Sequence, residues 1–484
     1  MAAAPTVWVV VLGDFGRSPR MQYHAWSLAE AGYDVRVLAS PGSPPIRPLL
    51  DARNVRLHYL APPPPWVGRL PALAALLAKA LLQAGLMLWA VLAALPRPAA
   101  ILMQNPPAIP VMAVLWLAAL RHRAALIIDW HNLAYSILAL KHGRRRWLIR
   151  LARAYERFFG RRAAAHFTVT RAMAAFLRAE FGITAAVLYD RPPEMFRPLA
   201  SDARAAALGR LGPQLTAAAI GAPLALGALG GGTAAGGGGG GGRPAVVVSS
   251  TSWTPDEDFG ILLDAALRYD AAAATAAGQI APDRAPDRGG LPDVLFVITG
   301  RGPQRDEYLG RIRRLALRRC AFASVWLEPE DYPLLLGAAD LGVCLHTSSS
   351  GLDLPMKARA PRERGRRCVV DMFGAGLPVC AVRFDCIGEL ITDGETGLLF
   401  DGPEALAAQL QELLWGFGGG GGGGGGRLGG MRAAVERTQC GRRWRENWRE
   451  VAAPVVAAAC GGPPGGGAGA GAGAGGRKRG VRAS

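Results

Sequence analysis

The sequence predicts an α/β protein built from two doubly wound, Rossmann-like domains that face a cleft. Its 484 residues, half of them hydrophobic, suffice for two separate cores. Short apolar runs typical of buried parallel strands alternate with helical segments in both halves. An Ala/Gly-rich stretch separates the halves. We expect a first domain over 1–195, a linker with a low-complexity insertion over 196–243, a second domain over 244–455 and a disordered tail over 456–484.

The first domain is expected to begin with a buried strand, a glycine turn and a helix. The helix should run from about Pro19 to Ala31, with Ser18 as its N-cap, Pro19 at its first position and Gly32 after its end. The five predicted strands are Val7–Leu12, Val35–Leu38, Ile101–Met103, Leu126–Ile128 and Phe167–Val169. Ligands of such a sheet bind at the carboxyl ends of its strands.

The second domain repeats this alternation. Thr254, Pro255 and Glu257 form a capping-box pattern that predicts the start of a helix. The predicted strands are Ala245–Val248, Val294–Ile298, Leu341–Leu345 and Pro378–Val382. The glycine tract over 418–426 is low in complexity and interrupts this domain.

The segment from Leu70 to Leu95 is apolar except for Lys79 and Gln83. Its length would reach across a hydrocarbon core of ~30 Å. Three interpretations stay open: a helix in the membrane interface, a buried helix of the first domain, or a membrane span.

The charge and cysteine patterns limit the function classes. A net charge of +18 favours anionic partners such as phosphorylated substrates or anionic lipids, and no nucleic-acid-binding module accompanies it. Seven cysteines without a CxxC pair argue against a disulfide framework or a structural zinc site. No signal peptide precedes the first strand, so we expect a cytosolic catalytic face.

The first candidate site is the turn Gly13-Asp-Phe-Gly-Arg-Ser-Pro-Arg20. Glycines allow close backbone approach, and a helix N-terminus favours an anion. Cations are unfavourable at that end of a helix dipole, so Arg17 and Arg20 indicate a phosphate beside Gly16 and Ser18. The alternative is an ordinary capped turn with solvated arginines.

The second candidate site is Asp129-Trp-His-Asn132, directly after a predicted strand. Transfer of a group to a hydroxyl requires a base for its proton, and Asp129 or His131 could serve. The alternative is a hydrogen-bonded cluster beside the core.

The second domain offers groups that suit a diphosphate and sugar hydroxyls. Glycine turns, hydroxyls and single cations bind phosphates, whereas carboxylates accept hydrogen bonds from hydroxyl groups. Solvated helix carboxylates are the alternative for the two acids. The candidates are Arg301, Gly302, Ser349, Ser350, Gly351, Lys357, Asp371 and Glu389.

Several motifs together resemble one family, the chitobiosyldiphosphodolichol β-mannosyltransferases of glycosyltransferase family 33, which have GT-B architecture. The motifs lie in both domains and cover most of the chain outside the glycine tracts. They are Leu12-Gly-Asp-Phe-Gly-Arg-Ser-Pro-Arg20, Gln104-Asn-Pro-Pro107, Ile128-Asp-Trp-His-Asn132, Tyr155-Glu-Arg-Phe-Phe-Gly160, Ser249-Ser-Thr-Ser-Trp-Thr254, Trp326-Leu-Glu328 and Leu345-His-Thr-Ser-Ser-Ser-Gly-Leu-Asp-Leu-Pro-Met-Lys357.

The resemblance implies inverting transfer of mannose from GDP-mannose to GlcNAc₂-diphosphate-dolichol on the cytosolic face of the endoplasmic reticulum. It implies Arg301 and Lys357 at the donor diphosphate, Asp371 or Glu389 at hydroxyls, and the Arg17–Arg20 turn at the lipid diphosphate. The base would be His131 or Asp129, with Asp14 and Asp353 as competitors. No cofactor is required and Mg²⁺ is allowed; other early dolichol-pathway mannosyltransferases are expected partners.

This chain departs from the family pattern after Lys357. Ala358 to Cys368 intervene before Val369, whereas in the family Met-Lys runs directly into Val-Val-Asp. The insertion either displaces the proposed phosphate lysine from the proposed ribose acid or loops out harmlessly. The alternative functions are another GT-B nucleotide-sugar transferase acting on a lipid-linked acceptor and a catalytically dead membrane scaffold.

Overall fold

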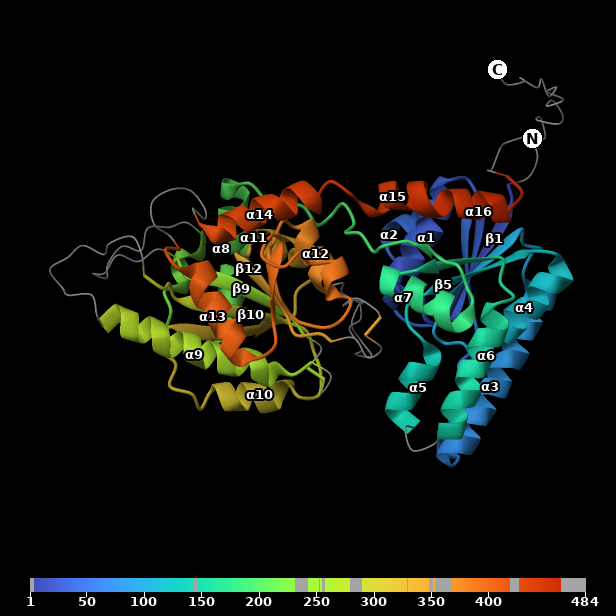
Figure 1. The fold of residues 1–484 in the computed structure, drawn as a ribbon, viewed down its shortest axis with the longest axis horizontal. Helices are drawn as coiled ribbons and strands as arrows, with labels where there is room; N and C mark the ends of the chain where they lie inside the picture. Colours follow the sequence, from blue (N-terminus) through green and yellow to red (C-terminus); the bar gives the residue numbers. More distant parts are fainter. Residues whose placement is uncertain are drawn as a thin grey trace, which may run out of the picture.

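The protein consists of two α/β domains side by side (Figure 1), as the sequence predicted. The computed structural model describes residues 4–142, 146–230, 243–251, 253–254, 257–278, 290–328, 330–347, 351–352, 368–417 and 426–462. Each domain holds a seven-stranded sheet.

The first sheet is wholly parallel and has the order β3-β2-β1-β4-β5-β6-β7. All five predicted strands are present, and the prediction missed β3 and β7. The strands are β1 (Thr6–Asp14), β2 (Asp34–Ser40), β3 (Val55–Tyr59), β4 (Ala100–Asn105), β5 (Ala125–Trp130), β6 (Ala165–Thr168) and β7 (Ala186–Val187). The helices are α1 (Pro19–Glu30), α2 (Arg47–Asp51), α3 (Ala72–Trp89), α4 (Val111–His122), α5 (Ala134–His142), α6 (Arg146–Gly160) and α7 (Arg171–Phe176), with short turns η1 (Phe15–Arg17), η2 (Pro65–Arg69), η3 (Ala90–Ala94) and η4 (Leu177–Phe181).

Helix α1 begins and ends close to the predicted residues. Pro19 is its first residue, and Gly32 follows it with a φ of 90°, which favours glycine. The predicted side-chain cap is wrong, however. Ser18 occupies the N-cap position but its hydroxyl donates to Gln104 Oε1 on β4 instead of accepting from the helix.

The second sheet has the order β14-β13-β12-β9-β10-β11-β8, and only β8 is antiparallel to its neighbour. All four predicted strands are present. The strands are β8 (Ala219–Gly221), β9 (Ala245–Ser250), β10 (Val294–Thr299), β11 (Cys320–Val325), β12 (Leu341–Cys344), β13 (Val379–Val382) and β14 (Gly397–Phe400). The helices are α8 (Ser201–Ala218), α9 (Phe259–Gly278), α10 (Arg305–Ile312), α11 (Asp331–Ala338), α12 (Cys368–Gly374), α13 (Pro403–Leu414), α14 (Arg427–Thr438), α15 (Trp444–Asn447) and α16 (Ala453–Ala459), with turns η5 (Leu226–Gly230), η6 (Ile387–Glu389) and η7 (Trp448–Ala452).

Most of the predicted linker is part of the second domain. Leu208, Leu211 and Leu215 recur at helical spacing and are buried, so the Ala-rich composition forms helix α8. Strand β8 then pairs with β11. The second domain therefore begins near Ser201, and the glycine run over 231–242 lies outside the described residues.

The predicted start of helix α9 is also corrected. The helix begins at Phe259, and Asp258 Oδ1 accepts from the Gly260 N–H at 2.9 Å. Glu257, the expected partner in a capping box, accepts from the Thr251 hydroxyl at 2.7 Å. The glycine tract over 418–425 and most of the insertion after Lys357 lie outside the described residues.

The apolar segment forms helix α3 and the turn η3. It contains the one described helix that is long and apolar enough to cross a membrane, Ala74–Ala94, and only 17% of this stretch is buried. Burial in the core is therefore wrong as an interpretation. A single crossing would put its two flanks on opposite sides of a bilayer, yet β3 and β4, which flank it, belong to one sheet.

The C-terminal helices return to the first domain. Figure 1 shows α15 and α16 lying over the first domain, whereas α14 lies over the second. The indole of Trp444 donates to Ser27 at 3.1 Å, and that of Trp448 donates to His24 at 3.0 Å. The chain up to Ala459 is thus helical rather than a tail from residue 456.

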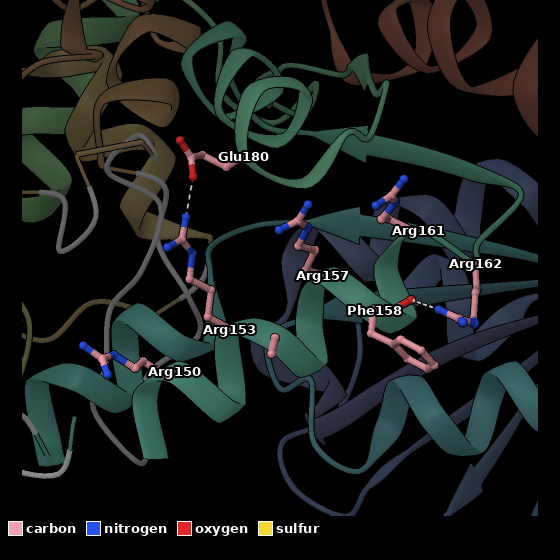
Figure 2. Close-up of a pocket in the computed structure, with 8 residues that line it drawn as sticks. Arg150, Arg153, Arg157, Phe158, Arg161, Arg162 and Glu180 are labelled. Carbon is pink, nitrogen blue, oxygen red and sulfur yellow. Dashed lines mark hydrogen bonds and ion pairs between the residues drawn. The ribbon is translucent and has the colours of Figure 1, made fainter. Parts of the chain in front are cut away.

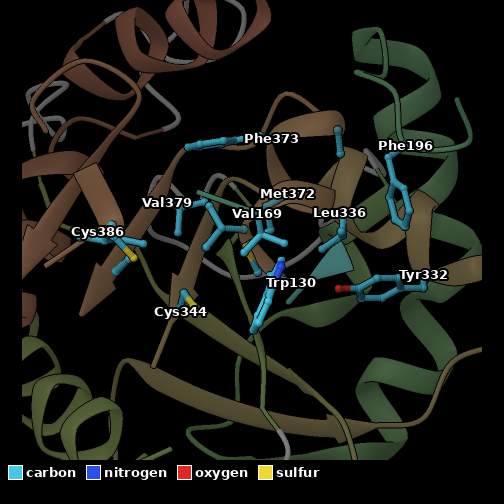
Figure 3. Close-up of a cluster of buried hydrophobic side chains, with 14 of the residues drawn as sticks. Trp130, Val169, Phe196, Tyr332, Leu336, Cys344, Met372, Phe373, Val379 and Cys386 are labelled. Carbon is cyan, nitrogen blue, oxygen red and sulfur yellow. The ribbon is translucent and has the colours of Figure 1, made fainter. Parts of the chain in front are cut away.

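One buried apolar cluster extends through both domains. It includes Trp130 and Val169 from the first domain with Leu336, Met372 and Phe373 from the second. Figure 3 shows these side chains close together. Because water is excluded there, the two sheets share part of one core.

Candidate active site

The carboxyl ends of β1 and β5 carry the predicted groups of the first domain. Asp14 ends β1, and its carboxylate accepts from Gly16 N–H at 3.0 Å and from Ser43 N–H and Oγ–H, each at 2.9 Å. Arg17 Nε lies 3.0 Å from the same carboxylate. Asp14 therefore joins two loops, and these contacts leave it poorly placed to act as a base. Gly16 packs closely against the second loop, because a Cβ there would lie 2.3 Å from Ser43 O.

Arg20 does not reach the surface, contrary to the expectation that it contacts a phosphate. Its side chain is 3% exposed, and Nε and Nη2 donate to Asp129 at 2.7 and 2.9 Å. Its Nη1 donates to Asp190 at 3.1 Å. Burial opposes the charge, but the two carboxylates outweigh it and raise the pKa of Arg20. The prediction of a diphosphate contact for Arg20 does not fit this burial.

Asp129 is the centre of a buried network at the end of β5. It has no exposed surface, and besides Arg20 it contacts His131 Nε2 at 2.8 Å, with His24 Nε2 at 3.2 Å. Burial alone would raise the pKa of Asp129, but Arg20 and His131 hold it well below its usual range. A fully buried carboxylate cannot touch a substrate, so Asp129 can act only by orienting its neighbours.

His131 is the member of this network nearest the surface, at 5% exposed. Its Nε2 contacts the Asp129 carboxylate, so an acid orients the imidazole ring. In this pair the carboxylate is placed where it can orient a histidine that acts as a base. The geometry thus favours His131 over Asp129 as the group that meets a substrate.

Glu156 supports the loop that carries His131. It has no exposed surface and accepts from Asn105 Nδ2 at 2.9 Å and from the N–H groups of Ala134 and Tyr135, which begin α5. Asn105 in turn donates to the carbonyl of Asn132. A carboxylate at a helix N-terminus is stabilising, and this one fixes the loop after β5.

The second domain carries a tight turn at the end of β10. Gly300 has a φ of 148°, and a Cβ there would lie 1.9 Å from Thr251 O, so only glycine fits. Arg301 follows, exposed, with its guanidinium carbon 4.3 Å from the ring centre of Trp326. Gly302 completes this turn. Gly351 has a φ of 71°, and Asp371 is 5% exposed in α12. Ser349, Ser350, Asp353 and Lys357 lie outside the described residues.

Glu389 has a role that the sequence did not reveal. Its carboxylate crosses to the first domain and accepts from Arg171 N–H at 2.6 Å, Ala172 N–H at 2.8 Å and the Tyr189 hydroxyl at 2.8 Å. It therefore caps helix α7 from the other domain. Burial and Glu389 together raise the pKa of Tyr189, so its phenol remains a donor. A contact with sugar hydroxyls would have to displace these donors.

Other residues of the network lay beyond the predictions. His24 follows Arg20 by one helical turn, a spacing that could have revealed it. Asp190 and Glu156 carry no such local signal. In the second domain, His346 follows β12, and its Nδ1 lies 3.4 Å from Glu257.

Comparison with known proteins agrees with this fold. The family description "Glycosyl transferase 4-like domain" matches residues 16–189, and "Glycosyl transferases group 1" matches residues 276–415. Anabaena HepE in complex with UDP-glucose superposes with a TM-score of 0.57 at 18% identity, covering 93% of this chain and 99% of that one. A glycosyltransferase from Rickettsia africae gives 0.54 at 12% identity, with 93% and 97% covered. The protein is thus a glycosyltransferase of GT-B architecture.

The curated relatives identify the family within this class of glycosyltransferases. The human and mouse proteins named chitobiosyldiphosphodolichol beta-mannosyltransferase are 41% and 40% identical to this chain, over 86% and 84% of it and 86% and 80% of their own lengths. The Arabidopsis thaliana protein named UDP-glycosyltransferase TURAN is 44% identical, over 85% of this chain and 89% of its own. The chain belongs to the chitobiosyldiphosphodolichol β-mannosyltransferase family.

Proposed function

We propose that this chain transfers mannose from GDP-mannose to the outer GlcNAc of GlcNAc₂-diphosphate-dolichol, with inversion, at the cytosolic face of the endoplasmic reticulum. The observation that carries the proposal is the similarity to relatives named for a chitobiosyldiphosphodolichol acceptor, which extends through both domains. The arrangement at the end of β5 supports it, because an oriented histidine is what attack by a hydroxyl requires.

In the proposed reaction the acceptor 4-hydroxyl attacks the anomeric carbon of mannose from the face opposite the diphosphate. The new carbon–oxygen bond forms as the bond to the β-phosphate oxygen breaks, and GDP leaves. The imidazole of His131 takes the hydroxyl proton, while Asp129 holds the ring. Arg301 and Lys357 would neutralise the charge that develops on GDP. Arg17 and the Gly16–Ser18 turn would contact the lipid diphosphate.

The test is product formation from labelled GDP-mannose and a chitobiose diphospho-lipid, with membranes or detergent-solubilised protein. A trisaccharide lipid with a β-linked mannose is expected. Removal of divalent cations with EDTA tests whether Mg²⁺ takes part. If neither this chain nor a version without residues 358–368 forms product, the proposed transfer is wrong; product from the shortened chain alone would identify a dead variant.

The base assignment has its own variants. His131→Ala should lower kcat by about 10²–10⁴-fold, because the proton then has no oriented acceptor. His58→Ala, on the edge strand β3, is the matched control and should retain activity. Equal activity of the two variants would remove His131 from the mechanism.

A second donor class has one specific observation in its favour. The Arabidopsis relative is named a UDP-glycosyltransferase. Competition between GDP-mannose and UDP-sugars for binding separates the two, and tighter binding of a UDP-sugar would replace the proposed donor.

A further inference from the structure

Large apolar side chains are exposed mainly in the first domain. Among the described residues, fourteen of the sixteen exposed large hydrophobic side chains lie before residue 160. A soluble surface seldom gathers so many, and such a patch commonly marks a membrane or protein interface. The exposed apolar side chains are therefore concentrated in the first domain.

Helix α3 supplies one part of this patch. Its C-terminal end is held by the core through Met87 and through Ala90 and Val91 of the adjoining η3, whereas Leu77 and Leu81 are 57% and 73% exposed. The helix projects from the first domain, and α6 projects from the same end (Figure 1). Helix α4 packs against both of them. Leu77 and Leu81 thus lie on the exposed part of the helix, away from the core.

Helix α6 has three faces. Ala152, Glu156 and Gly160 recur every four residues and are buried. The arginines at 150, 153 and 157, with Arg161 directly after the helix, form a second, exposed stripe. Trp147, Leu151 and Phe158 form a third, apolar stripe and are about half exposed or more. A basic stripe beside exposed aromatic and leucine side chains is typical of helices that lie in a membrane interface.

The basic stripe lines a cavity of about 880 Å³. Five arginines and one acid surround it: Arg150, Arg153, Arg157, Arg161, Arg162 and Glu180. Arg153 is paired with Glu180, and Arg162 donates to the Phe158 carbonyl. In Figure 2, Arg157 and Arg161 extend to the same side of α6. The excess of positive charge suits a phosphate group.

We propose that α3 and α6 form a membrane-docking surface whose arginines bind the headgroups of anionic phospholipids. We define this docking surface by Leu77 and Leu81 on α3, by Arg150 and Arg157 on α6, and by Arg161 directly after α6. The leucines enter the boundary between headgroups and acyl chains, and the arginines contact lipid phosphates. A bilayer is favoured over a soluble anion, because only a bilayer presents phosphates and apolar chains side by side.

This docking goes beyond the proposed transfer reaction and does not depend on the donor. None of its five residues belongs to the proposed catalytic or donor site. Failure of the two proposals can therefore be distinguished: docking variants should keep transfer to a short-chain acceptor in detergent, whereas His131→Ala should keep membrane binding.

The test is flotation of the full chain with vesicles of phosphatidylcholine alone and with added phosphatidylinositol or phosphatidylserine. The triple variant Arg150→Gln, Arg157→Gln, Arg161→Gln should lose about a hundredfold in partitioning to anionic vesicles, because each basic residue contributes about fivefold. Raising the salt concentration should erase the difference. The matched control changes three exposed arginines of the second domain, Arg311, Arg313 and Arg314, to Gln.

The apolar part is tested with Leu77→Ser, Leu81→Ser, which should lower binding to both vesicle types without changing its salt dependence. Thermal melts establish that each variant is folded; the substituted side chains are exposed, so unchanged melting is expected. Wild-type binding by the arginine triple variant would overturn the proposal. So would an equal loss in the control variant, since net charge alone would then explain it.

Discussion

Arg20 is the residue whose position differs most from its expected role. Its guanidinium neutralises Asp129 and Asp190 inside the first domain. Removing one partner of a buried ion pair leaves an uncompensated charge, which costs more than the pair contributes. The Arg20 side chain therefore contributes both to the stability of the site and to the arrangement of its catalytic groups.

Arg20→Ala should lower the free energy of unfolding by about 3–5 kcal/mol. Arg17→Ala, three residues earlier, breaks a partly exposed pair with Asp14 and should cost about 1 kcal/mol or less. Urea unfolding of both variants measures the difference. Similar values for the two would show that Asp129 is not held by Arg20.

His166 should make the stability depend on pH. Burial lowers its pKa from 6.5 to about 4, so the folded protein keeps it neutral. Below pH 6.5 the unfolded chain binds the proton first, and the free energy of unfolding falls by up to ~1.4 kcal/mol per pH unit until about pH 4. Buried His24, whose pKa is also lowered, acts in the same direction.

The variant His166→Asn isolates this contribution. It keeps an acceptor for the Trp130 indole, which donates to His166 Nδ1 at 3.1 Å. Between pH 7 and pH 5 its stability should fall by about 2 kcal/mol less than that of the wild type. Denaturant unfolding at both pH values gives the comparison, and identical slopes would contradict the assignment.

At the scale of elements, α7 is a short helix capped by a residue of the other domain. Thr170 caps it locally and also donates to the Leu352 carbonyl at 2.6 Å, so two contacts at this helix join the domains. Any ligand that hydrogen-bonds to the Glu389 carboxylate must displace its three donors, the Arg171 and Ala172 amides and the Tyr189 hydroxyl. Binding there and contact between the domains are linked thermodynamically.

Glu389→Ala should speed hydrogen exchange at the Arg171 and Ala172 amides by about 10- to 100-fold, because each loses its acceptor, at a cost of about 1–3 kcal/mol. Glu395→Ala, at an exposed position six residues on, is the control and should leave these amides unchanged. Exchange at wild-type rates in Glu389→Ala would mean that the cap contributes nothing.

The sequence could predict the central elements but not those defined by distant partners. Apolar runs gave nine strands, because buried parallel strands have a local signature. The three-residue β8 exists only through pairing with β11, and α8 was hidden by its Ala/Gly composition. In the site, motifs located His131 and Glu389 but not their contacts. Asp190 and α7 lie far along the chain from the residues that they contact, Arg20 and Glu389, so no local pattern indicates these contacts.

At the scale of the whole molecule, the C-terminal helices fasten the second domain to the first. Trp444 and Trp448 are almost fully buried against α1. This contact reaches the active-site network, since Trp448 donates to His24, which lies beside Asp129. The end of the chain thus supports the active-site network through His24, which lies 424 residues before Trp448.

Trp448→Ala should destabilise the first domain by about 3–5 kcal/mol and make α15 and α16 sensitive to protease. Trp415→Ala is the control, because Trp415 is 60% exposed and its loss should stay within about 0.5 kcal/mol. Thermal melting and limited proteolysis check both. Resistance to protease in Trp448→Ala would show that other contacts suffice to hold the helices.

Because β3 and β4 lie in one sheet, the depth to which α3 can enter a bilayer is restricted. Because both flanks of α3 stay on the same side, the helix can enter only one leaflet. It would act there as a wedge that spreads the headgroups and leaves the opposite leaflet unchanged. Partitioning should then increase with vesicle curvature, as for other one-sided amphipathic insertions.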